Sequence, residues 1–171
     1  MWTGRPDSKR LFALADVFLV PFTLMWGGFA IFWEAAVIGI GARSGRAAPS
    51  FFVLWGIPFV LIGQYLVWGR FIYKRWDRQR TVYAVTNQRV LTLRGHTLQS
   101  MFLNQLPTIN QTARRDGSGT LDFGNLPFGY TFWANTGMDW LSRRSGLLVF
   151  YDVQNVANVY RLIADQRPGR A

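Results

Sequence analysis

The chain has 171 residues, no cysteine and a formal net charge of +10, from 19 lysine and arginine residues against 9 aspartate and glutamate residues. The lack of cysteine excludes disulfides, thiolate metal sites and a cysteine nucleophile. The excess of positive charge favours an anionic partner, either phospholipid or nucleic acid.

Two long apolar runs occupy the first half of the chain, from Val17 to Trp33 and from Phe51 to Ile72. About 20 apolar residues in a helix cross the roughly 30 Å hydrocarbon core of a bilayer. Both runs therefore predict transmembrane helices, the first when it extends past Glu34. The first run is too long for a cleaved signal peptide, and a second run follows after a short loop. We expect an antiparallel transmembrane hairpin over residues 11–73, with its loop from Gly39 to Ser50.

Basic residues flank this hairpin on both sides. Three precede it and five follow it, namely Arg5, Lys9 and Arg10, then Arg70, Lys74, Arg75, Arg78 and Arg80. The positive-inside rule places both flanks in the cytoplasm, together with the second half of the chain. We expect a cytoplasmic segment over residues 1–10 and a basic juxtamembrane linker over residues 74–80.

Three polar side chains interrupt the apolar runs: Asp16, Glu34 and Gln64. The two acids lie near the helix ends, where a carboxylate reaches water. Intramembrane acids also mark ion paths. The alternative is therefore an accessory subunit or oligomeric component of a membrane transport system, with these side chains along a path between hairpins. Small residues on the helices are compatible with a homo-oligomer.

From residue 81 onward, short β-type segments alternate with turn residues. The expected strands are Thr81–Val85, Val90–Leu93, Gln99–Leu103, Thr108–Arg114, Thr120–Phe123 and Leu147–Tyr151. The sequence Asp116-Gly117-Ser118-Gly119 predicts a hairpin turn. Asp152 is expected to cap a helix, because Val153, Val156, Ala157, Tyr160 and Ile163 recur at helical spacing. The β domain is thus expected over residues 81–167, before a tail at 168–171, and the fold class is α+β.

Aromatic residues are frequent between the last two expected strands, at Phe128, Tyr130, Phe132, Trp133 and Trp140. We interpret them as core residues. The alternative is an interfacial or partner-binding loop. The strand pairing around residues 124–146 is not fixed by the pattern.

The hairpin, the run from Tyr83 to Val90 (YAVTNQRV), and Asp116 to Thr120 with Phe123-Gly124 together resemble the bacterial membrane proteins that carry a pleckstrin-homology-like (PH-like) domain. Pro6-Asp7 and Lys9-Arg10-Leu11-Phe12 before the hairpin, and Gly69-Arg70-Phe71 after it, resemble one branch of that family. The resemblance covers nearly the whole chain. It implies a strongly bent, seven-stranded antiparallel sheet capped by a C-terminal helix, located at the bacterial inner membrane. It does not imply an enzyme.

Few residues support catalysis or metal binding. His96 is the sole histidine and follows Gly95 in an expected surface turn. An enzymatic role would require aspartates gathered around it. A metal site needs several histidine, cysteine or carboxylate ligands, and the candidates considered in the expected β domain are Asp116, Asp122, Asp139 and Asp152. Two of them, Asp116 and Asp152, are explained as a turn residue and a helix cap. We expect no enzyme, no metal and no cofactor.

The basic residues of the second half are the strongest binding signal. The candidate patch comprises Lys74, Arg75, Arg78, Arg80, Arg89, Arg114 and Arg115. Each such charge near an anionic leaflet is worth roughly 1 kcal/mol. The alternative is a topology signal alone. Nucleic acid is not expected, because the domain is tethered beside a membrane and lacks a helix-turn-helix or zinc pattern. The sequence thus predicts a non-catalytic, membrane-anchored binding or scaffolding module for anionic lipid head groups or an unknown protein partner.

Overall fold

The computed structural model describes residues 1–43, 45, 50–125, 133–138, 140 and 148–167. The chain forms two compact units. One is Phe12–Ile72, here called the apolar hairpin, and the other combines Met1–Leu11 with Tyr73–Ala171, here called the β domain. The predicted α+β class is confirmed, with two long apolar helices followed by two antiparallel sheets and a C-terminal helix.

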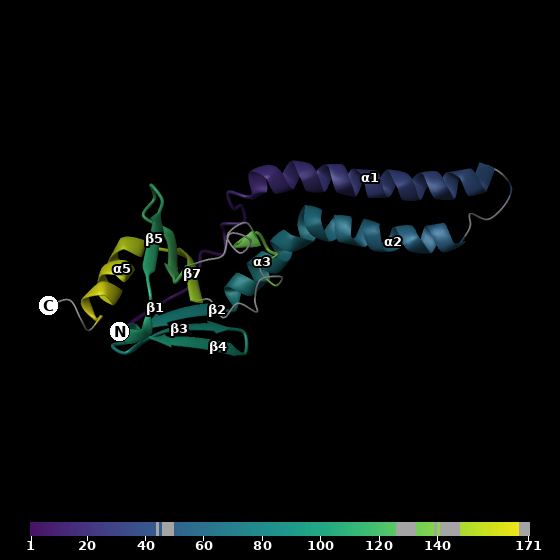
Figure 1. The fold of residues 1–171 in the computed structure, drawn as a ribbon. Coiled ribbons are helices and arrows are strands. Elements are labelled where there is room, and N and C mark those ends of the chain that lie inside the picture. The colour runs from purple at the N-terminus through teal and green to yellow at the C-terminus, as the bar shows by residue number, and fades with distance from the viewer. Residues whose placement is uncertain (44, 46–49, 126–132, 139, 141–147, 168–171) are drawn as a thin grey trace. The chain divides into compact units, whose positions relative to one another are not determined.

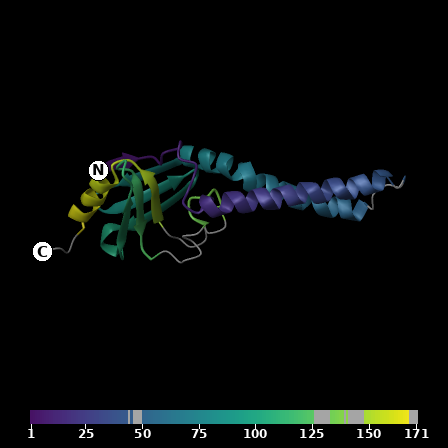
Figure 2. The ribbon, with the colours of Figure 1, turned by 90° about the horizontal axis from the view of Figure 1, so that it is seen from above.

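The apolar hairpin consists of α1 (Asp16–Arg43) and α2 (Ser50–Gln64), which run side by side in Figures 1 and 2. A π-helical turn, η1 (Tyr65–Gly69), follows α2 and leads directly into α3 (Arg70–Gln79). At 1.5 Å per residue, the 28 residues of α1 span about 42 Å. The second segment, Ser50–Gln79, combines α2, η1 and α3 into 30 residues. By length and composition, α1 and this second segment could each cross a membrane.

Small residues bring the two helices of the hairpin together. Gly27 on α1 and Gly63 on α2 are both buried. A Cβ atom built on Gly63 would lie 3.1 Å from the Cα atom of Gly27, so the two backbones nearly touch. The neighbouring Gly28 faces open space. A side chain is thus tightly restricted at the contact but not beside it.

The β domain contains two antiparallel sheets (Figure 1). Sheet A has the order β1-β2-β3-β4, with β1 (Trp2–Gly4), β2 (Thr81–Val85), β3 (Arg89–Arg94) and β4 (Thr97–Phe102). A 3₁₀ turn, η2 (Leu103–Gln105), precedes sheet B. Sheet B has the order β5-β6-β7, with β5 (Ile109–Ala113), β6 (Gly119–Phe123) and β7 (Leu148–Val153). Helix α5 (Val156–Asp165) follows β7 and packs on β5 and β6.

The core of the β domain is built around Phe150 of β7, which is fully buried. Its ring stacks on Tyr83 at a centroid distance of 4.5 Å and meets Phe123 edge-on at 5.0 Å. Trp2 stacks on it from the N-terminal strand at 6.3 Å. Both sheets and the N-terminus therefore share one core, which also includes Val156, Val159 and Ile163 of α5. The N-terminal segment is part of the domain, although its sequence gave no strand signal.

The structure corrects the expectation for the start of the C-terminal helix. Asp152 does not cap the last helix, because it lies within β7 and α5 begins only at Val156, after Asn155. Residues 74–79 of the expected linker form most of α3.

The turn at Asp116 is confirmed, since its carboxylate accepts hydrogen bonds from the Ser118 N–H and hydroxyl at 3.1 and 2.7 Å. Leu147, Phe128, Tyr130 and Phe132 lie outside the described residues, whereas Trp133 is half-buried and Trp140 is exposed.

Candidate functional site

Helix α3 carries its charged residues on two different faces. Lys74 and Arg78 are four residues apart and therefore lie on the same side of the helix. Their exposed fractions are only 2% and 5%. Arg75 is exposed on another side. The predicted basic cluster is thus divided between the interior and the surface of the β domain.

The buried side of α3 meets Asp152 of β7. Asp152 is 1% exposed, and its two carboxylate oxygens accept hydrogen bonds from the guanidinium groups of Arg78 and Arg114. The side-chain amide of Asn135 donates to the same carboxylate at 3.1 Å. A buried carboxylate is stable only when it is paired in this way. These four residues are called the Asp152 cluster below.

Backbone geometry aims the Asp152 carboxylate at this cluster. The pairing of β6 with β7 shifts register between Gly119 and Leu121, which is a β-bulge. Asp152 lies in the bulge with φ at +49°, and Asn135 also has a positive φ, at +62°. Aspartate and asparagine adopt this left-handed conformation more readily than other non-glycine residues. Bulges commonly redirect a side chain, as here.

The same cations also fix the N-terminal segment. Arg78 donates to the carbonyl oxygen of Asp7 at 2.5 Å and to that of Arg10. Lys74 donates to the carbonyl oxygen of Leu11 at 2.6 Å and to that of Asn135. The Asp7 N–H in turn donates to the Asp152 carbonyl at 3.2 Å. The buried cations therefore hold residues 7–11 against α3 and β7, which is a structural role.

The electrostatics of the cluster follow from its pairing. Burial alone would raise the pKa of the Asp152 carboxyl, but the positive charge of Arg78 and the hydrogen bonds from Arg114 and Asn135 outweigh it. The pKa of Asp152 is therefore lower than that of an ordinary aspartate, and the group remains charged at neutral pH. By contrast, burial raises the pKa of Asp122.

The remaining residues of the predicted patch are dispersed. Arg80 stacks on the Trp76 ring at 3.9 Å, and Arg89 stacks on the Phe102 ring at 4.0 Å. Arg89 begins β3, whereas Thr81, beside Arg80, pairs with the other end of that strand. At about 3.3 Å per residue, a separation of five residues along the strand is about 17 Å. Arg115 is exposed in the turn between β5 and β6. The exposed arginines therefore do not form one compact patch.

The structure shows an exposed apolar surface that the sequence analysis did not identify. Residues directly opposite each other in sheet A share a face, and the face turned away from the core pairs Val82 with Leu93, Leu93 with Leu98, and Arg89 with Phe102. Leu93, Leu98 and Phe102 are 43%, 61% and 38% exposed. This surface is called the outer apolar face, and it comprises Val82, Ala84, Leu91, Leu93, Leu98 and Phe102.

A sequence signal for this face existed. A strand with one buried face usually has polar residues on its other face, but β3 carries Val90 on one face and Leu91 and Leu93 on the other. Val90 is fully buried, and Leu93 points outward. Apolar residues on both faces indicate an outward-facing apolar surface, which the described residues leave uncovered.

The polar residues of the hairpin do not converge on one path. Asp16 is 3% exposed and pairs with the fully buried Arg70, while its other oxygen accepts the Ala13 N–H at 2.5 Å. Gln64 accepts a hydrogen bond from the Trp68 ring nitrogen at 2.9 Å. Of Asp16, Glu34 and Gln64, only Glu34 has a buried side-chain oxygen that lacks a hydrogen-bond partner among the described residues.

Residues that could support catalysis are not gathered within the described ranges. His96 is exposed in the turn between β3 and β4, as expected. No group of three or more histidine, cysteine, aspartate or glutamate side chains suited to a metal ion occurs in the described part of the chain.

Comparison of the chain with models of protein families, with curated proteins and with solved structures found no match.

Proposed function

We propose that the chain is a membrane-anchored, non-catalytic binding module, in which the apolar hairpin holds the β domain at the inner face of a bacterial membrane. Basic residues flank the hairpin on both sides, which favours a cytoplasmic location for the domain. The described part of the β domain includes seven strands in two sheets, followed by α5, and this arrangement supports a PH-like fold.

The outer apolar face carries the proposal. Soluble proteins rarely expose several large apolar side chains next to each other, and exposed apolar patches of this kind are typical of protein interaction sites. Leu93 and Leu98 lie directly opposite each other on adjacent strands, and both are exposed. Phe102 extends the patch, with the Arg89 guanidinium stacked on its ring. A protein surface with an apolar centre fits this face.

Charge favours an acidic partner. The β domain contains 16 lysine and arginine residues against 7 aspartates, a net charge of +9 by subtraction. Arg75, Arg80, Arg89, Arg114 and Arg115 are the exposed members of the predicted basic set, and of these Arg114 also pairs with Asp152. Such a domain attracts a partner with acidic residues around its apolar contact, and a membrane tether raises the effective concentration of weak contacts.

Photo-crosslinking in native membranes tests this function. A photoreactive amino acid replaces Leu98 on the outer apolar face, and a control carries it at Asn158, which is exposed on α5. We expect a discrete crosslinked protein from position 98 only, and we expect Leu93→Asp to abolish it. The acidic partner should also dissociate at high salt.

Three outcomes would contradict this function. Equal products from positions 98 and 158 would indicate non-specific contact. Crosslinks only to anionic lipid would assign the face to head groups instead. Crosslinks only to a second copy of the chain would indicate a homo-oligomer without a separate partner.

The transport alternative is supported by one observation, the buried oxygen of Glu34. Ionisable groups within membrane spans are costly and often functional. If the hairpin forms part of a transport system, Glu34→Gln should abolish a measurable flux while the protein still inserts. Unchanged flux would remove this alternative.

A further inference from the structure

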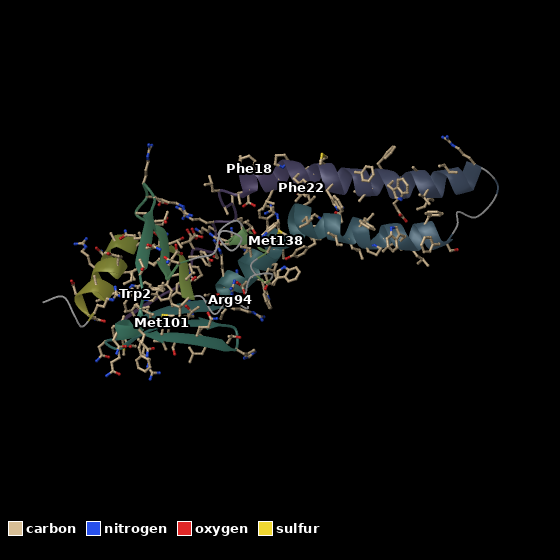
Figure 3. All side chains as sticks on the ribbon, viewed as in Figure 1. Trp2, Phe18, Phe22, Arg94, Met101 and Met138 are labelled. Carbon is tan, nitrogen blue, oxygen red and sulfur yellow. The ribbon has the colours of Figure 1, made fainter. Side chains whose placement is uncertain are left out.

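The β domain contains a small polar cavity between the inner face of sheet A and α3. Its volume is about 50 Å³. The residues that matter here are Lys74, Asp77 and Arg78 of α3, Tyr83 of β2, and Thr92 and Arg94 of β3. Figure 3 shows Arg94 at the end of sheet A beside α3, where it pairs with Asp77. All of these residues belong to the β domain.

Two buried hydroxyl groups in this cavity lack an acceptor. Thr92 is 7% exposed, and its hydroxyl has no hydrogen-bond partner among the described residues. The Tyr83 hydroxyl accepts the Tyr151 N–H at 3.1 Å, and within the described ranges no acceptor receives its own proton. A buried polar group without a hydrogen-bond partner lowers the stability of the folded state, so native structures seldom contain one unless a ligand or a water binds it. Both hydroxyls are available as donors.

The described residues around the cavity carry more positive than negative charge. Those that line it include three cations, Lys74, Arg78 and Arg94, and one carboxylate, Asp77. Adding Asp152, which pairs with Arg78, gives three positive charges against two negative charges among the described residues. Burial raises the pKa of the Tyr83 phenol, so the phenol stays neutral and remains a donor. Hydroxyl donors within a positive environment favour an acceptor that carries negative charge.

We propose that this cavity binds one small oxyanion of the phosphate or sulfate class, which accepts hydrogen bonds from the Thr92 and Tyr83 hydroxyls. The volume is that of about three to five water-sized spaces, at roughly 10–15 Å³ each. A tetrahedral oxyanion fits such a space. The inference goes beyond the proposed partner-binding function, because the cavity faces the inner side of sheet A and the outer apolar face is on the other.

The test uses the full chain in maltoside micelles, which contain no phosphate. Inorganic phosphate is titrated in at constant ionic strength, with chloride as the reference anion, and binding is followed by calorimetry and by thermal unfolding. Thr92→Val removes one donor at nearly constant volume. Thr97→Val, on the exposed Thr97 of β4, is the matched control.

The proposal gives a specific pattern of results. Without phosphate, Thr92→Val should unfold at the same or a higher temperature than the wild type, because it removes an unsatisfied buried hydroxyl. With phosphate, the variant should bind at least tenfold more weakly, whereas Thr97→Val should bind like the wild type. This opposite response to one substitution separates ligand binding from simple destabilisation.

A second arm distinguishes the two sources of such an anion. Nanodiscs with phosphatidylglycerol and no inorganic phosphate supply only lipid head groups. A thermal shift in micelles with phosphate assigns the site to a free anion, and a shift only in these nanodiscs, lost in Thr92→Val, assigns it to a head group. An equal shift with chloride, no shift in either arm, or unchanged binding by Thr92→Val would overturn the proposal and leave a water-filled cavity.

Discussion

The substitution Asp152→Asn should destabilise the β domain by an amount that follows from the Asp152 cluster. The substitution keeps the shape of the side chain and removes its charge, so the buried Arg78 loses its only carboxylate within the described residues. Breaking a buried ion pair by removing one partner typically costs about 3–5 kcal/mol. Arg114 adds little, because its side chain is 39% exposed and water can solvate it.

The lower end of that range applies here. Arg78 keeps its hydrogen bonds to the carbonyl oxygens of Asp7 and Arg10 and to the Asn135 side chain. A loss of about 3 kcal/mol corresponds to a roughly 150-fold increase in the opening equilibrium, at 1.36 kcal/mol per factor of ten. A typical domain has only about 5–15 kcal/mol of stability, so the effect is large.

Hydrogen exchange measured by mass spectrometry on the full chain in nanodiscs checks this prediction region by region. Peptides from β7 and α5 should exchange about 150-fold faster in Asp152→Asn. Asp122→Asn is the matched control, because it makes the same chemical change on the neighbouring strand. The pKa of Asp122 is raised by burial, so its charge costs stability at neutral pH, and neutralisation should leave exchange unchanged or slow it.

The pH dependence provides an independent check. The folded-state pKa of Asp152 lies below the unfolded value of about 3.9, so its contribution is fully present above about pH 4. The contribution is lost as the pH falls through the lower folded-state pKa. The difference between wild type and Asp152→Asn should therefore shrink in acid. Equal exchange in the Asp152 and Asp122 variants at neutral pH would refute the reasoning about the buried pair.

Three further results are expected. Arg70→Leu should destabilise the hairpin by about 3–5 kcal/mol, because it leaves the buried Asp16 unpaired, and adding Asp16→Leu should recover most of the loss in a double-mutant cycle of thermal unfolding in micelles. Gly27→Leu should separate α1 from α2 and lower the melting temperature, whereas Gly28→Leu, beside it on open space, should not; equal effects would contradict the close contact. Burial raises the pKa of Tyr83, so the free energy of unfolding should fall as the pH rises above about 10, and urea unfolding of Tyr83→Phe should show a weaker pH dependence.

Sequence patterns predicted the elements of the β domain well where a period of two was clear. The strand Thr81–Val85 matches the observed β2, and Gly119–Phe123 differs from the prediction by one residue. The N-terminal strand was missed because Trp2–Gly4 is three residues long and pairs with a strand almost 80 residues away. Nothing local indicates such a pairing, since it depends on the burial of Trp2 against Phe150.

Asp152 shows why local capping rules failed near the C-terminus. An aspartate before an apolar run at helical spacing is a good N-cap signal. In the structure, two arginines 74 and 38 residues away in the sequence bind its carboxylate, and the bulge in β7 directs it toward them. Removing one partner of a buried ion pair costs about 3–5 kcal/mol, which exceeds the roughly 1 kcal/mol of an N-cap. Capping rules consider only neighbouring residues, so they do not register these long-range partners of Asp152.

The basic residues illustrate what composition alone leaves open. Lys74 and Arg75 are adjacent and equally charged, yet one is 2% exposed with two backbone carbonyls as acceptors and the other is on the surface. Charge counting treats them alike, and only the orientation of α3 separates a structural cation from one that can meet a partner. The consequence can be tested in the crosslinking experiment. Arg75→Gln should leave folding unchanged and weaken only a salt-sensitive contact, whereas Lys74→Gln should loosen residues 7–11 even when no partner is present.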